Sequence, residues 1–116
     1  MTEESFGLAA STLAVVREIL AAEPRVAKAI LFGSRAKGTE RPGSDIDLAL
    51  VGEELDVDVL GRLSRQFEES PIPYEVDLLL LDTLDHPGLR DHIARVGRVL
   101  YERQASSSAT TASGRR

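Results

Sequence analysis

The sequence predicts an α+β fold, in which helices pack on one face of a small mixed β-sheet. Three observations lead to this fold class. The 116 residues, of which 42% are hydrophobic, are enough for one modest core but not for two. Apolar residues follow helical and strand periodicities in the order α, β, β, α, β, α. This order contains too few β-α-β units for a doubly wound sheet.

The first half of the chain predicts one helix and two strands. Apolar residues over positions 6–20 recur at spacings of three and four, which indicates a helix that ends before Pro24. Residues 26–32 are rich in β-formers and predict a strand, and residues 35–44 contain two glycines and a proline and predict a loop. Residues 45–51 alternate at first and then become apolar, which favours a buried strand.

The second half predicts two helices on either side of a third strand. Helical spacing indicates a helix over residues 56–70, which prolines terminate. Residues 74–81 are almost continuously hydrophobic, so we expect a strand in the centre of the sheet. A last helix begins near Leu89 and ends at Gly97. Residues 98–102 are compatible with either a short edge strand or further helix.

We expect these elements to form one domain over residues 5–102. Residues 103–116 predict a disordered tail, because the segment is rich in Ser, Thr and Ala and has no large apolar residue to bury. Apolar runs are too short to span a membrane and the N-terminus lacks a signal pattern, so we expect a cytoplasmic protein that does not contact a membrane.

The composition excludes several kinds of chemistry. The chain has no cysteine, which excludes disulfides, zinc-thiolate sites and thiol nucleophiles. A net charge of −5 and an aromatic content of 4% disfavour direct binding to nucleic acid. Local phosphate chemistry remains open, since a few basic residues and a divalent cation would suffice.

A glycine-serine turn follows the first predicted strand. Gly33 allows the backbone to approach a phosphate closely, and Ser34 adds a hydroxyl and an amide. Arg35 and Lys37 would neutralise phosphate charge. The alternative is an ordinary turn, for which glycine and serine are also common.

Acidic residues on two predicted strands indicate a metal site. Asp45 and Asp47 share one strand face with Cα atoms roughly 6–7 Å apart, which lets them share a divalent cation. A solvated acidic face is the alternative. Asp77 stands in the most apolar strand, where an unpaired carboxylate is costly. If the two strands are neighbours, Asp77 completes a three-carboxylate cluster, with Glu75 as the rival ligand.

The chemistry that these features describe is nucleotidyl transfer. Oxygen donors without His or Cys nearby favour Mg²⁺, or Mn²⁺, over Zn²⁺. The two histidines, His86 and His92, have no metal-ligand spacing between them, and we expect both at the surface.

The stretch GSRAKGTERPGSDIDLAL resembles the signature of the polymerase-beta-like nucleotidyltransferase superfamily. The short length and the ending LDHPGLRDHIARVGRVLYE are similar to the minimal nucleotidyltransferase (MNT) family, and the resemblance extends from about Val26 to Tyr101. It implies the polymerase-beta-like fold and Mg²⁺-dependent transfer from ATP. The implied site residues are Gly33 and Ser34 in the phosphate-binding turn, Arg35 and Lys37 as triphosphate contacts, Asp45 and Asp47 as the metal pair, and Asp77 as the third metal-binding carboxylate and base.

The resemblance also implies a biological partner. MNT proteins are commonly paired with a HEPN-domain RNase toxin, which they silence as antitoxins by transferring AMP from ATP to a toxin tyrosine. The shortness of the chain favours such a protein substrate, because resistance enzymes of the superfamily carry an additional helical domain for small molecules. Neutralisation of the toxin by binding alone, and transfer to a small molecule, are the alternatives. A homo-oligomer or hetero-oligomer is compatible with either mode of action.

Overall fold

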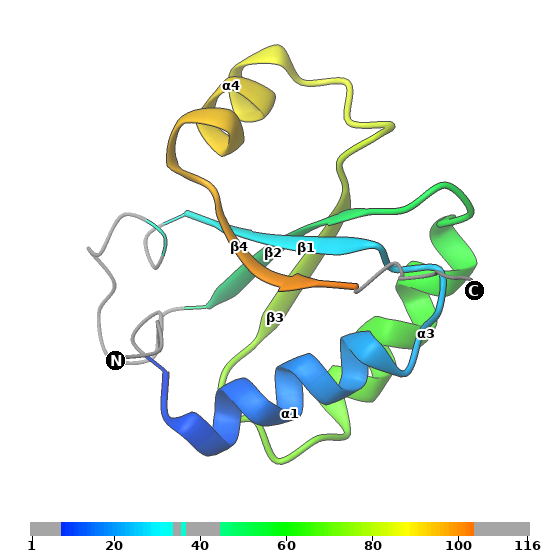
Figure 1. Cartoon of the computed structure of the whole chain (residues 1–116), viewed down its shortest axis with the longest axis vertical. Helices are drawn as coiled ribbons and strands as arrows, with labels where there is room; N and C mark the ends of the chain where they lie inside the picture. The colour runs from blue at the N-terminus through cyan, green and yellow to red at the C-terminus, as the bar shows by residue number, and fades with distance from the viewer. Residues whose placement is uncertain (1–7, 34–35, 37–44, 104–116) are drawn as a thin grey trace, which may run out of the picture.

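The computed structural model describes residues 8–33, 36 and 45–103. The elements within these ranges are α1 (Ala10–Ala21), β1 (Lys28–Phe32), β2 (Ile46–Val51), α3 (Val57–Glu68), β3 (Val76–Leu80), α4 (Pro87–Val96) and β4 (Arg98–Glu102). The predicted α+β fold is confirmed, with α1 and α3 together on one side of a four-stranded sheet (Figure 1). In the described part of the chain, no helix has the length and apolar character needed to cross a membrane.

The sheet has the strand order β3-β2-β1-β4 and is mixed. β1 is antiparallel to both β2 and β4, whereas β2 and β3 run parallel and are connected through α3. The expectation of a central third strand is therefore wrong, because β3 lies at an edge. Its apolar run reflects partial burial: Val76, Leu78 and Leu80 pack against the core while Asp77 is exposed. Residues 98–102, for which a short edge strand and further helix were the alternatives, form the edge strand β4.

The core lies between the sheet and the two helices α1 and α3. Leu31 in β1 and Leu48 in β2 are fully buried, and they meet Leu20 of α1 and Leu63 of α3 in one apolar cluster. Burial of one such side chain contributes about 1.5–3 kcal/mol. α3 begins where the Asp56 carboxylate accepts a hydrogen bond from the Val59 N–H at 2.9 Å.

The third described helix, α4, packs against the opposite face of the sheet, so the expectation that the helices share one face is wrong for α4. Ala29 and Leu31 point into the core, so the alternating residues Ile30 and Phe32 point to the other face. A Cβ built on Gly97, the residue that ends α4, would stand 2.6 Å from Ile30 Cγ2. This crowding explains why glycine is needed where α4 passes into β4.

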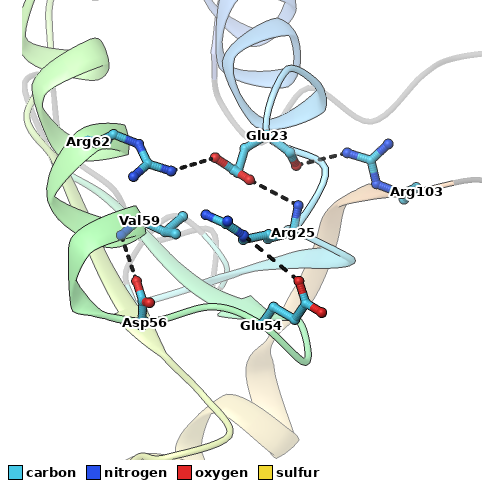
Figure 2. Close-up of polar contacts among 7 residues, drawn as sticks. All are labelled: Glu23, Arg25, Glu54, Asp56, Val59, Arg62 and Arg103. Atoms are coloured by element: carbon cyan, nitrogen blue, oxygen red, sulfur yellow. Dashed lines mark hydrogen bonds and ion pairs between the residues drawn. The ribbon is translucent and has the colours of Figure 1, made fainter.

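Two charged side chains tie the end of α1 to other elements (Figure 2). Arg103 donates from its guanidinium to the carbonyl oxygens of Ala21, Glu23 and Val26, at 3.2, 2.8 and 3.2 Å. The Glu23 carboxylate accepts a hydrogen bond from Arg62 of α3 at 3.4 Å. Arg103 is the first residue of the expected tail and is held by these contacts, while residues 104–116 lie outside the described residues.

Candidate active site

Two predicted site residues lie directly opposite one another on neighbouring strands. In the parallel pair of β2 and β3, Asp47 is in register with Asp77. Ile46 and Leu48 point into the core, so Asp47 points to the face that α4 also contacts. Since adjacent strands are about 4.8 Å apart, the two carboxylates are close neighbours. The condition under which Asp77 joins the acidic pair is thus met.

Asp47 experiences the charge of both other acids. Burial raises the pKa of the Asp47 carboxyl group above its ordinary value and is the largest cause. The negative charges of Asp77 and Asp45 raise the pKa further, as does a side-chain hydrogen bond with Asp77. Every one of these causes disfavours the ionised form, so the site would be relieved by a cation placed among the carboxylates.

The fit of a divalent cation depends on how closely the carboxylates gather. Over residues 8–33, 36 and 45–103, no three His, Cys, Asp or Glu side chains form a group that could hold a metal ion as they stand. Asp47 and Asp77 form a two-carboxylate centre, and Asp45 is exposed immediately before β2. Glu75, the rival ligand, is also exposed, and its carbonyl accepts a hydrogen bond from Ile46. The oxygen donors suit Mg²⁺ or Mn²⁺ in type.

The glycine turn at the end of β1 contacts the acidic pair. Gly33 has a φ of +79°, a left-handed conformation that glycine adopts without steric cost. A Cβ built on Gly33 would stand 2.5 Å from Asp47 Oδ2, so any side chain there would push the Asp47 carboxylate aside. The structure therefore brings Gly33 next to the Asp47 carboxylate. Ser34, Arg35 and Lys37 lie outside the described residues.

One site contact comes from a residue that sequence reasoning placed at the surface. The Gly33 N–H donates a hydrogen bond to Nε2 of His92 at 3.3 Å, and the imidazole meets the Phe32 ring edge-on. The surface prediction is wrong for His92, because α4 folds onto the face that carries the carboxylates. It is right for His86, which is exposed and caps α4. Sequence periodicity marks Ile93 as an inward residue of α4, but it gives no signal for the neighbouring His92.

A cleft opens next to Asp77 along the edge strand. It has a volume of about 580 Å³ and lies between the end of α3 and β3, with Phe67, Tyr74 and Asp77 among its lining residues. Volumes of about 300–1,000 Å³ are typical of ligand sites. One carboxylate of the pair is therefore reachable from the edge of the sheet.

Known proteins share both the sequence pattern and the fold of this chain. The family described as Polymerase beta, Nucleotidyltransferase matches residues 15–106. The chain is 40% identical over 82 residues, 70% of its own length and 71% of the relative, to the Probable protein adenylyltransferase MntA of Haemophilus influenzae.

Two solved structures extend the comparison to the fold. A toxin-antitoxin crystal structure with AMP-PNP superposes with a TM-score of 0.66 at 26% identity, over 79% of this chain and 74% of the other. The MNT antitoxin in complex with the tri-AMPylated HEPN toxin of Shewanella oneidensis has the same fold, with a TM-score of 0.61 at 22% identity over 84% and 75% of the two chains. Together with the matched residues, these findings show that the chain belongs to the polymerase beta nucleotidyltransferase family, among the minimal nucleotidyltransferases of the MntA type.

Proposed function

We propose that this chain is a Mg²⁺-dependent nucleotidyltransferase that transfers AMP from ATP to a tyrosine of a HEPN RNase toxin and thereby acts as its antitoxin. The observation that carries the proposal is the pair Asp47 and Asp77, in register on parallel strands, with Gly33 against Asp47. The relative from Haemophilus influenzae, named as an adenylyltransferase, supports AMP as the transferred group. We also propose a cytoplasmic location, where ATP would be available as the substrate.

We assign the metal to the three acids. Asp47 and Asp77 would hold it together with Asp45, whose negative charge already acts on Asp47. Bound there, Mg²⁺ would neutralise the triphosphate and orient it for attack. The raised pKa of Asp47 supports this assignment, because the negative charges that raise it would also attract a divalent cation.

The transfer step needs no protein nucleophile. The tyrosine hydroxyl oxygen attacks the α-phosphorus of ATP, the bond between the α-phosphorus and its bridging oxygen breaks, and pyrophosphate leaves. We assign Asp77 as the base that takes the hydroxyl proton, since it is exposed and lines the cleft beside β3. Gly33 and Ser34, with Arg35 and Lys37, are assigned to the phosphates.

The experiment is a transfer assay with both partners. The chain is incubated with ATP labelled on the α-phosphate, Mg²⁺ and the HEPN protein encoded by the adjacent gene, and label on the toxin is followed by mass spectrometry to its acceptor residue. We expect label on a tyrosine, and loss of label with Asp47→Asn. Asp58→Asn is the matched control, because Asp58 is an exposed acid in the first turn of α3. An unlabelled toxin that is nevertheless inhibited would overturn the enzymatic proposal.

The same variants separate catalysis from neutralisation by binding alone. An antitoxin that acts by binding would protect cells equally well when Asp45 and Asp47 are both changed to Asn. An antitoxin that acts as an enzyme would no longer protect the cells, because each change replaces a carboxylate that would bind the metal with a neutral amide. Growth of cells that express the toxin with either version of the chain reads out the difference.

A further inference from the structure

One side chain of α4 reaches the glycine turn beside the carboxylates. The Gly33 N–H donates to His92 Nε2 at 3.3 Å, across 59 positions of sequence. The imidazole also stands edge-on to the ring of Phe32, with ring centroids 6.3 Å apart and an interplanar angle of 83°. His92 therefore holds the chain at the point where β1 ends and the turn begins.

α4 is fixed to the sheet on both sides of His92. On the N-terminal side, the Arg90 guanidinium donates to the carbonyl oxygen of Leu81, just after β3, at 2.5 Å. On the C-terminal side, Ile93 is buried and Gly97 packs against Ile30 of β1. A helix held in this way is a rigid support, so the position of the imidazole is set by the fold and not by the turn that it contacts.

Gly33 has little of its own to hold its backbone conformation. Gly33 has no side chain, and glycine has access to more backbone conformations than any other residue. Its φ of +79° is one of many conformations open to it. The hydrogen bond that the Gly33 N–H donates to a fixed neighbour, His92, selects that conformation and with it the close approach to Asp47.

We propose that His92 is a positioning residue for nucleotidyl transfer. Its neutral imidazole, with the proton on Nδ1, accepts the Gly33 hydrogen bond and holds Gly33 against Asp47 in the backbone conformation that receives a nucleoside triphosphate. The inference rests on the nucleotidyltransferase function proposed above, and it adds a residue that the signature stretch of residues 33–50 does not contain.

The test compares variants that remove or retain the acceptor. His92→Leu keeps the contact with Phe32 but has no acceptor, and we expect its Kd for AMP-PNP with Mg²⁺, measured by calorimetry, to rise about tenfold. His92→Gln offers an amide oxygen and should bind within about threefold of the unaltered chain. In the transfer assay, His92→Leu should raise the KM for ATP while kcat changes less than about threefold.

The matched control is the other histidine of the same helix. His86 Nδ1 accepts from the Leu89 N–H at 3.0 Å, whereas the hydrogen bond from Gly33 goes to His92. His86→Leu therefore removes an imidazole acceptor from α4 without releasing Gly33. The His86→Leu variant should bind the nucleotide like the unaltered chain. Equal weakening of nucleotide binding by both leucine variants would overturn the proposal, because it would show that either change disrupts helix α4 as a whole.

A measurement on the unaltered chain tests the same contact. Nitrogen-15 NMR of the unaltered chain should show the His92 proton on Nδ1 and an unprotonated Nε2, and a proton on Nε2 of the neutral ring would overturn the proposal. Wild-type affinity in His92→Leu would do the same and leave the proposed function intact. A chain that binds AMP-PNP but labels no toxin would overturn the proposed function alone, since the order of affinities still tests His92.

Discussion

Gly33 and Asp47 approach one another so closely that a side chain at the glycine would displace the Asp47 carboxylate. A Cβ at Gly33 would stand 2.5 Å from Asp47 Oδ2, and the φ of +79° adds a second steric penalty for any other residue. Phe32, the residue before the glycine, is paired with Asp47 across the antiparallel β1 and β2. Gly33 and the Asp47 carboxylate therefore lie in close contact, and a side chain added at position 33 would move the carboxylate.

Gly33→Ala should damage activity more than stability. The added methyl group pushes the Asp47 carboxylate away and forces alanine into a left-handed conformation, which costs about 1–3 kcal/mol. We expect AMP transfer to fall at least about a hundredfold, by the effect that small misplacements have on catalytic geometry. Thermal unfolding and the transfer assay measure the two effects.

Gly61→Ala is the control for this change. Gly61 lies inside α3, and a Cβ there would meet nothing within 4 Å. The substitution should stabilise the protein by about 0.4–1 kcal/mol and leave transfer unchanged. If Gly33→Ala behaved in the same way as Gly61→Ala, the contact with Asp47 would have no role in the site.

Asp47→Asn should stabilise the metal-free protein at neutral pH while abolishing transfer. Folding raises the pKa of Asp47, so the folded state favours the protonated carboxyl group. The contribution of Asp47 to stability is therefore fully present below its unfolded pKa of about 3.9 and is lost as pH rises through the higher folded value. Asparagine carries no charge at any pH and escapes this loss.

Thermal unfolding in EDTA across pH 3–8 measures the effect. The melting temperatures of Asp47→Asn and the unaltered chain should converge at the acidic end, and the variant should become the more stable one as pH rises. A constant difference over the whole range would contradict the assigned origin of the pKa shift. A variant that became less stable than the unaltered chain as pH rose would mean that folding lowers the pKa of Asp47.

Mg²⁺ should reverse the order of stability between these two proteins. A cation that binds the folded state stabilises it by about 1.4 kcal/mol at ten times its Kd, which corresponds to a rise of several degrees in Tm. The unaltered chain should show this rise with Mg²⁺ or Mn²⁺, and Asp47→Asn and Asp77→Asn should show little of it. EDTA should also stop transfer, and added Mg²⁺ should restore it. An equal rise in all three proteins would place the cation elsewhere.

Local patterns explain how much of the fold and site could be predicted from the sequence. The alternation around Ile46 and Leu48 is a property of consecutive residues, and it correctly placed Asp47 on the face away from the core. The same kind of pattern identified α1, α3 and the end of α4 at Gly97. These features depend on neighbours in the chain, so composition and spacing suffice to predict them.

The remaining features depend on contacts between distant segments. A run such as residues 76–80 reads alike for a central strand and for an edge strand covered on one face, and only the pairing with β2 reveals that β3 is an edge. The same pairing sets Asp77 beside Asp47. His92 has no distinctive spacing, and its contact with Gly33 arises because α4 folds back over 59 positions of sequence. Sequence periodicity contains no information about such a return.

Arg103→Gln should lower stability without altering the kinetics of the folded protein. The guanidinium donates to three carbonyl oxygens at and beyond the end of α1, of which the one on Glu23 is drawn in Figure 2. The candidate site lies at the other end of β1, where Gly33 follows Phe32. We expect a loss of about 1–3 kcal/mol, because hydrogen bonds from charged groups are stronger than neutral ones but these are partly exposed to water. Thermal unfolding measures the loss, and KM and kcat below the transition should match those of the unaltered chain.

Arg95→Gln is the control, since its exposed ion pair with Asp91 within α4 is worth only about 0.3–0.5 kcal/mol. Equal losses in the two variants would mean that the end of α1 does not depend on Arg103, and a change in KM would mean that its contacts extend their influence to the nucleotide site.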